Sequence, residues 1–249
     1  MIQFSIETAQ IGNIPAYMVY PLKRDLGKAV IFYHGWSSTA ALQKTRALIL
    51  AAYGYTVLCA DAVHHGERGA LPDYYTVPAY DLFWDTIFQN MEEFPALAAR
   101  LRAEGYGKPW VMGHSMGGIT AMGLSYRYAR DIAGAVSFNG SGDWELTHLF
   151  IEARFGVVLR RDWPLYDRIS AASPIHHVEA MKEVPLFMTN GEADTSVDPR
   201  AQAHFAALLA EAGGKGQRVT YPGLGHFVTT NMMDDAICFM EKNGRSGCC

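Results

Sequence analysis

Short apolar runs alternate with stretches of helical periodicity along most of this 249-residue chain. The runs are rich in β-branched and aromatic residues, so they predict buried strands, and the stretches between them place apolar residues three or four positions apart, so they predict helices. The predicted strands are 29–34, 55–60, 109–112, 133–138, 184–190 and 217–221, and the predicted helices are 40–53, 79–104 and 115–130. This alternation predicts an α/β fold with a mostly parallel sheet.

Two local signals refine this outline. Residues 2–8 and 14–20 alternate between apolar and polar positions and predict an antiparallel hairpin around Gly12 and Asn13. Pro95 lies inside the stretch 79–104, so we expect either one kinked helix or two helices joined there.

The alternation breaks between about residues 140 and 183. Aromatic and aliphatic residues dominate this segment, among them Trp144, Phe150 and Trp163, and they predict a helical insertion. We find no internal repeat and no low-complexity linker, so we expect a single domain over residues 1–249.

Composition and charge exclude several classes of function. A formal charge of −4 without a dense run of Lys or Arg argues against a nucleic-acid footprint and against a polybasic membrane anchor. No apolar stretch approaches the roughly 18 residues of a membrane span. The first residues alternate like a strand and do not resemble a secretory signal, so we expect a cytoplasmic protein.

Cysteine usage points to no special chemistry. The four cysteines are Cys59, Cys238, Cys248 and Cys249, and their spacing fits neither a disulfide framework nor a zinc site. We therefore expect them to be structural or incidental.

The motif Gly-His-Ser-Met-Gly at 113–117 carries the strongest chemical signal. It follows an apolar run and precedes a helical one, so the chain passes from strand to helix through a sharp turn at Ser115. Such a turn strains the backbone, and glycines on either side let the neighbouring backbone approach closely. We therefore expect the hydroxyl of Ser115 to be presented to solvent.

Three further signals follow the ends of predicted strands. His34 and Gly35 end the strand 29–34, Asp194 lies just past 184–190, and His226 lies in the glycine-rich loop after 217–221. Because ligand sites in parallel sheets lie beyond the carboxyl ends of the strands, these residues are expected to share one edge with Ser115. Serine, acid and histidine occur in the chain order typical of one fold family.

These motifs resemble those of the α/β-hydrolase superfamily, and the resemblance covers nearly all of the chain. Within it, the chain resembles small bacterial esterases related to the dienelactone hydrolase and prolyl-oligopeptidase branches. The resemblance rests on the His-Gly turn, the segment Asp-x-x-x-His-Gly-x-Arg at 61–68, the elbow at 113–118, and the G-x-x-D and G-x-x-H loops.

The resemblance implies a sheet of about eight strands with helices on both faces. It also implies that the insertion at about 140–183 forms a small cap over the serine, with Trp144, Phe150 and Trp163 binding the acyl or leaving group. An alternative is that these helices pack on the sheet in the ordinary way. Asp61 and Arg68 are expected to form a buried ion pair near the oxyanion loop.

The chemistry of a serine hydrolase assigns a role to each motif. Ser115 is predicted to attack a carbonyl, His226 to take its proton as general base, and Asp194 to orient the imidazole. The backbone N–H groups of Trp36 and Met116 are the predicted donors to the oxyanion. We expect hydrolysis of small or short-acyl carboxylic esters through an acyl-enzyme, with no metal and no cofactor.

Each assignment has a rival in the sequence. Asp143 follows the strand 133–138 at a position that some members of the superfamily use, and Asp198 precedes Pro199 and fits a helix N-cap better. His114 is next to the serine but should point away from it, and His34 should order the oxyanion loop. His64, His65, His176 and His177 lack the spacing of a metal site, so loop-ordering roles are expected for them.

Two other functions remain open from the sequence. An aminopeptidase or amidase of the same fold could use Glu145 and Glu152 to bind a substrate ammonium, and a non-catalytic binding protein is a third hypothesis. The physiological substrate and the oligomeric state are not predicted. The expected partner is a small-molecule ester.

Overall fold

The computed structural model describes residues 4–155 and 164–244. The strands are β1 (Phe4–Ile11), β2 (Ile14–Pro21), β3 (Lys28–Tyr33), β4 (Tyr55–Ala60), β5 (Trp110–His114), β6 (Gly134–Phe138), β7 (Leu186–Gly191) and β8 (Gly216–Tyr221). The helices are α1 (Lys44–Ala52), α2 (Val77–Ala103), α3 (Met116–Arg127), α4 (Trp144–Phe155), α5 (Pro164–Ala171), α6 (Val178–Met181), α7 (Pro199–Glu211) and α8 (Thr230–Asn243). Short 3₁₀ turns are η1 (Ala41–Gln43), η2 (Gly66–Arg68) and η3 (Pro174–His177).

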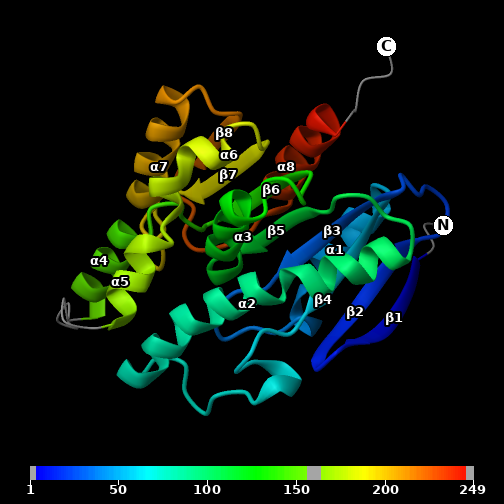
Figure 1. Cartoon of the computed structure of the whole chain (residues 1–249), viewed down its shortest axis with the longest axis horizontal. Coiled ribbons are helices and arrows are strands. Elements are labelled where there is room, and N and C mark those ends of the chain that lie inside the picture. The colour runs from blue at the N-terminus through cyan, green and yellow to red at the C-terminus, as the bar shows by residue number, and fades with distance from the viewer. Residues whose placement is uncertain (1–3, 156–163, 245–249) are drawn as a thin grey trace.

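The strands form one sheet in the order β1-β2-β4-β3-β5-β6-β7-β8 (Figure 1). β2 pairs antiparallel with both β1 and β4, and the remaining neighbours pair in parallel. The predicted hairpin is confirmed, with Ile11 opposite Ile14 across a turn in which Gly12 has a φ of +62°. The predicted α/β-hydrolase fold with a mostly parallel sheet is therefore confirmed.

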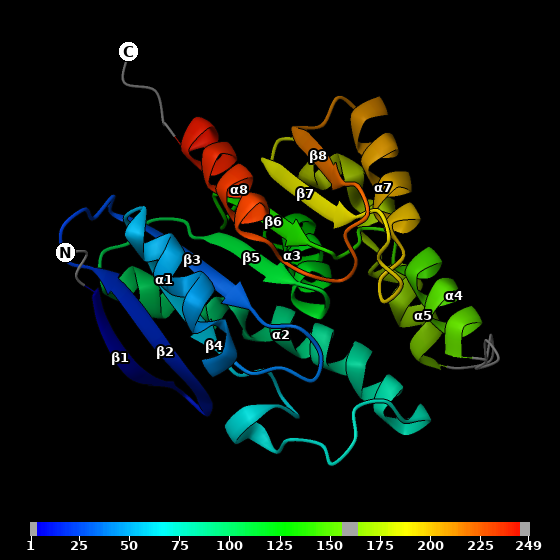
Figure 2. The same ribbon diagram turned by 180° about the vertical axis from the view of Figure 1, so that it is seen from behind.

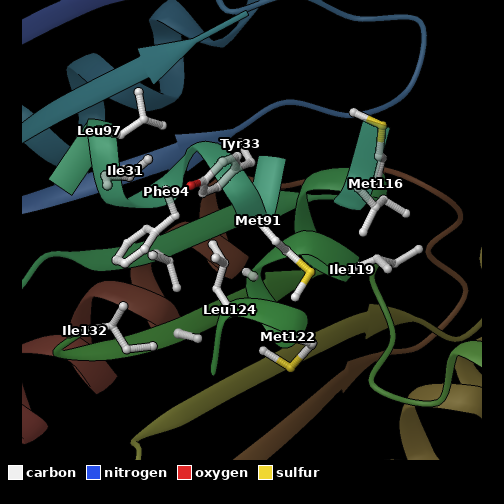
Figure 3. Packing of buried hydrophobic residues seen from close by; sticks show 14 of the residues in the cluster. Ile31, Tyr33, Met91, Phe94, Leu97, Met116, Ile119, Met122, Leu124 and Ile132 are labelled. Carbon is white, nitrogen blue, oxygen red and sulfur yellow. The ribbon is translucent and has the colours of Figure 1, made fainter. Parts of the chain in front are cut away.

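Helices cover both faces of the sheet. α1 and α8 lie on one face, and α2 and α3 lie on the other, as the two opposite views show (Figures 1 and 2). Because side chains alternate along a strand, Val30 and Phe32 of β3 pack toward α1 and α8, whereas Ile31 and Tyr33 pack toward α2 and α3. Figure 3 shows this second core, where the side chains of β3 meet those of α2 and α3.

The stretch 79–104 forms one helix, α2, which keeps Pro95 inside it. The helix begins after Thr76, whose hydroxyl accepts the N–H of Ala79, and Pro78 fits the first turn because its missing N–H would have no partner there. Of the two arrangements left open for this stretch, the structure has the single helix.

The segment after β6 contains α4, α5, η3 and α6. α4 and α5 contact each other, α4 contacts α7, and α5 contacts α2, so the pair lies beside the end of α2 (Figures 1 and 2). Trp163, Cys248 and Cys249 lie outside the described residues. None of the helices within 4–155 and 164–244 is long and apolar enough to cross a membrane.

Candidate active site

Ser115 sits in a strained turn between β5 and α3. Its φ of 57° and ψ of −119° lie outside the regions that side-chain-bearing residues usually adopt. The turn is possible because a Cβ at Gly117 would lie 2.1 Å from the carbonyl oxygen of Tyr33, and a Cβ at Gly113 would lie 2.3 Å from the carbonyl carbon of Gly117. The structure thus explains both glycines of the motif, because neither position has room for a side chain.

His226 and Asp194 meet across two different loops. The Nδ1–H of His226 donates to Oδ2 of Asp194 at 2.7 Å, and the side chain of Asp194 is fully buried. The other carboxylate oxygen of Asp194 accepts the backbone N–H groups of Ser196 and Val197. The carboxylate is therefore fixed in place from both sides, and the Nε2 of His226 is left as the basic nitrogen of the ring.

The two rival carboxylates have other partners. Oδ2 of Asp143 contacts Nδ1 of His204 at 2.7 Å, and its Oδ1 accepts the N–H of Leu146 in the first turn of α4. Asp198 caps α7 by accepting the N–H of Arg200, as the sequence predicted, and it also pairs with the guanidinium of that residue. Of the three candidates, Asp194 is the one that contacts His226.

The His-Gly turn runs directly beside the elbow. A Cβ at Gly35 would lie 3.3 Å from the carbonyl oxygen of His114 and 3.4 Å from Cβ of Ser115. His34 holds this turn, since its Nδ1–H donates to the carbonyl of Gly35 and its Nε2 accepts the N–H of Ala62. Burial lowers the pKa of His34, which keeps the ring neutral and able to both donate and accept.

A second histidine holds the next residue of the turn. The Nδ1–H of His65 donates to the carbonyl of Val63, and its Nε2 accepts the N–H of Ser37 at 3.3 Å. Burial lowers the pKa of His65 to about 4, so this ring is also neutral at physiological pH. The expected loop-ordering role of His65 is thus visible in its contacts.

The two predicted oxyanion donors come from this turn and from the elbow. Trp36 lies between Gly35 and Ser37, and its indole N–H donates to the carbonyl of Tyr74, which anchors the loop to the segment before α2. Met116 is the first residue of α3, where a backbone N–H has no carbonyl one turn earlier.

The ion pair expected between Asp61 and Arg68 does not form. Arg68 instead makes a bidentate pair with Glu93 of α2, at 2.8 and 2.7 Å, and donates to the backbone carbonyl of Asp61. The carboxylate of Asp61 accepts the backbone N–H groups of Ala40 and Glu67. The prediction was wrong because the backbone around Asp61 supplies its donors and α2 brings an acid to Arg68.

Ser115 and His226 line one cavity of about 710 Å³. This volume lies in the range of pockets that enclose small organic ligands. Trp36, Tyr75 and Tyr80 contribute aromatic side chains to its walls.

Two of the three aromatic residues predicted to bind substrate, Trp144 and Phe150, do not line the cavity. Trp144 is fully buried against Trp84 and Phe88, so its predicted place in the pocket is wrong. Phe150 is half-buried beneath the guanidinium of Arg200, 4.2 Å from the ring centre, and it does not line the cavity. Trp163 lies outside the described residues.

The same helix does reach the cavity, through different residues. Ile151 and Glu152 of α4 line it, whereas the predicted Trp144 and Phe150 face other neighbours. The sequence predicted an apolar helix but not which of its faces meets the cavity, because α4 carries apolar residues all around it. Arg46 of α1 and Tyr80 of α2 also line the cavity, and no sequence motif marked either residue.

Comparisons with known proteins place the chain in a family. A model of the prolyl oligopeptidase family matches residues 42–237. This chain belongs to that family. The Esterase YjfP of Escherichia coli (strain K12) is 26% identical over 96% of this chain and 98% of its own length. YitV of Bacillus subtilis (strain 168), a candidate esterase by its name, is 35% identical over 68% of this chain and 69% of its own.

Solved structures agree on the fold of this prolyl oligopeptidase family member. TT1662 from Thermus thermophilus superimposes with a TM-score of 0.83 at 20% identity, covering 99% of this chain and 100% of its own. An acylaminoacyl peptidase from Pyrococcus horikoshii gives a TM-score of 0.74 at 16% identity, and the match covers 98% of this chain but 41% of that one. The chain is therefore a serine hydrolase of the α/β-hydrolase superfamily, as its motifs indicated.

The remaining histidines of this family member are held by protein contacts. His114 does not point away from the site as expected, because its ring lies 4.7 Å from that of His226 and lines the same cavity. His176 contacts Glu145 at 2.5 Å, and His177 stacks on Tyr126. Among the described residues, no group of three or more His, Cys, Asp or Glu side chains is placed to hold a metal ion.

Proposed function

We propose that this protein hydrolyses small carboxylic esters through an acyl-enzyme, with Ser115 as the nucleophile. The observation that carries the proposal is the 2.7 Å contact between His226 and buried Asp194, in loops that bring His226 into the same cavity as the strained Ser115. A relative that is named an esterase and matches 96% of this chain favours esters over peptides as substrates. The cytoplasmic location stays a prediction.

In the proposed mechanism, the hydroxyl of Ser115 attacks the ester carbonyl while Nε2 of His226 accepts its proton. Asp194 holds the ring in the tautomer that leaves Nε2 free to accept, and it stabilises the imidazolium that forms. His226 then donates the proton to the departing alcohol. Water attacks the acyl-enzyme by the same route and releases the acid.

The oxyanion of each tetrahedral intermediate would be bound by the backbone N–H groups of Trp36 and Met116. The support for this assignment is the rigid setting of both residues. His34 and His65 hold the turn around Trp36, and α3 holds Met116. Preorganised donors of this kind are worth about 10²- to 10³-fold in rate each.

Replacement of the serine tests the proposal. Ser115→Ala should lower kcat on p-nitrophenyl acetate and butyrate by about 10⁴- to 10⁶-fold, and labelling by a fluorophosphonate should stop. Ser196→Ala is the matched control, because Ser196 lines the same cavity and contributes only its backbone N–H to Asp194. If Ser115→Ala still labelled, or if both variants lost activity equally, Ser115 would not be the nucleophile.

A further inference from the structure

Among the described residues that line the cavity, two besides the histidines are formally charged, Arg46 of α1 and Glu152 of α4. The two helices lie toward opposite ends of the sheet in both views (Figures 1 and 2). The proposed hydrolysis needs neither charge. An acid and a base at different places on the wall of one cavity can orient a charged substrate.

Glu152 is a buried part of the cavity wall. The residue is 5% exposed, and its Oε1 lies 3.1 Å from Nε2 of His148, one turn earlier on α4. Its other oxygen, Oε2, is buried and has no hydrogen-bond partner among the residues that the structure describes. A buried carboxylate oxygen without a donor costs free energy, so it indicates a place for a donor from outside the chain.

A chain of hydrogen bonds aims His148 at this carboxylate. The indole N–H of Trp84 donates to the hydroxyl oxygen of Tyr80 at 3.0 Å, and that hydroxyl contacts Nδ1 of His148 at 2.5 Å. Either the hydroxyl of Tyr80 or Nδ1 of His148 can be the donor in this contact, so the contact fixes the position of the ring and not its tautomer. The same ring places its Nε2 3.1 Å from Oε1 of Glu152.

Charge and burial around Glu152 agree with this arrangement. Burial raises the pKa of Glu152 to about 7 and lowers the pKa of His148 to about 4, so the pair carries at most one negative charge at neutral pH. Among the residues that the structure describes, the side chains that pack against His148 are Tyr80 and Trp84 of α2 and Tyr166 of α5. Arg46, His114 and His226 are the other charged or titratable groups that share the cavity, together with its tyrosines.

Stability alone does not account for an acid here. The preceding residue, Ile151, lines the same cavity with an apolar side chain, and an apolar residue at 152 would avoid the cost of burying a carboxylate. Perturbed ionisable groups in a catalytic cleft are candidates for function.

We propose that Glu152, oriented by His148, binds an ammonium group of the substrate. This inference rests on the proposed ester hydrolysis and names its substrate class, esters of small molecules that carry an amine. The ammonium would donate to Oε2, replace the missing partner and favour the ionised carboxylate. Arg46 would repel the same group from the α1 side of the cavity, which orients the ester carbonyl relative to Ser115.

A matched pair of esters tests the proposal. The probes are p-nitrophenyl 6-aminohexanoate and p-nitrophenyl heptanoate, in which a methyl group replaces the ammonium. The measured quantity is the ratio of kcat/KM for the charged ester to that for the neutral ester. Glu152→Gln should lower this ratio by about tenfold or more, since a hydrogen bond to a charged group is lost while the volume is kept.

The pH dependence of the ratio gives a second readout. The ammonium stays charged below pH 9, so between pH 6 and 8 the ratio should rise in the wild-type protein as Glu152 ionises. The ratio should stay flat in Glu152→Gln. Glu145→Gln is the control on the same helix, because Glu145 contacts Ser170 and His176 and does not line the cavity. Glu145→Gln should keep the wild-type kcat/KM ratio and its increase between pH 6 and 8.

The outcomes separate this inference from the proposed function. An equal ratio in wild type and Glu152→Gln, or a parallel loss on both esters, would show that Glu152 has no part in selecting the substrate. Failure of either ester to be hydrolysed in a Ser115-dependent way would contradict the proposed function instead. In that case, binding of the two corresponding methyl esters to Ser115→Ala protein, measured by calorimetry, tests the site without turnover. If adding Glu152→Gln leaves the Kd of the amine-bearing methyl ester unchanged, the inference is overturned.

Discussion

The two walls of the cavity are held by different kinds of contact. On the wall that carries Ser115, backbone meets backbone, because Gly117 lies against the carbonyl of Tyr33 and Gly35 lies against that of His114. On the α4 wall, side chains meet side chains, as Glu152 does with His148.

This difference assigns catalysis to the wall that carries Ser115 and substrate preference to the α4 wall. Backbone contacts admit no side chain, so the position of Ser115 is fixed by glycines at set spacings. Side-chain contacts on α4 can change without moving Ser115, His226 or Asp194. The first wall should therefore respond to substitution with loss of catalysis or of the fold, and the second with a change in which ester is preferred.

The largest loss of activity is expected from substitution of Asp194, the carboxylate that contacts His226. Asp194→Asn should lower kcat by up to about 10⁴-fold while leaving the fold intact, because an amide favours the wrong tautomer of His226. Steady-state kinetics on p-nitrophenyl butyrate measure it. Asp143→Asn is the control, since Asp143 pairs with His204, and it should change kcat far less. The reverse ranking would move the acid to the loop after β6.

Two residues of α4 should separate packing from selectivity. Trp144→Ala should lower the free energy of unfolding by about 3–5 kcal/mol, because the ring is fully buried, and urea denaturation measures the loss. Ile151→Ala removes a side chain from the cavity wall and should alter the preference among acyl chain lengths, by about 1–3 kcal/mol per methylene. A change in chain-length preference with Trp144→Ala alone would return that ring to the pocket.

A methyl group placed between the elbow and β3 tests the rigid wall. Gly117→Ala should lower the free energy of unfolding by about 3 kcal/mol, the upper part of the usual cost of overpacking, because its Cβ would overlap the carbonyl oxygen of Tyr33. Gly107→Ala is the control, since a Cβ there meets no atom within 4 Å, and it should change stability by less than about 0.5 kcal/mol. Equal midpoints in urea for the two variants would contradict the close approach.

Acid should loosen the turn that carries Trp36. The pKa of His65 is about 4 in the folded protein and is 6.5 for an unperturbed histidine, so below pH 6.5 the unfolded chain binds more protons. The free energy of unfolding should then fall with falling pH, and this one group should contribute about 2 kcal/mol of the loss by pH 5. The contribution is fully retained above pH 6.5.

His65→Gln tests this linkage, because glutamine supplies an acceptor near Nε2 but takes up no proton. Urea denaturation at pH 7.5 and pH 5 should show a smaller acid-induced loss in the variant than in the wild-type protein. His34 and His114 remain in both proteins, so their contributions cancel in the difference. An equal loss in both proteins would show that His65 keeps the same proton affinity when folded.

Much of the fold was predictable from local pattern. The strands and most helices begin and end within a few residues of their predicted bounds, because strand and helix periodicities differ within short windows. The choice between one helix and two around Pro95 was not predictable, since it depends on what α2 packs against. The phase of α4 was not predictable either, because its apolar residues surround the helix.

The sequence by itself determined the strand-turn-helix at Ser115, the loop positions of Asp194 and His226, and the family to which they point. These features depend on steric rules that act between residues a few positions apart, and the positions of the glycines in the sequence reveal those rules. Only the tertiary structure decided which acid contacts His226, that Arg68 pairs with Glu93, that Trp144 is core, and that Glu152 and Arg46 face the cavity. Such contacts join residues from distant segments, and strand order and helix packing bring them together, neither of which a local pattern contains.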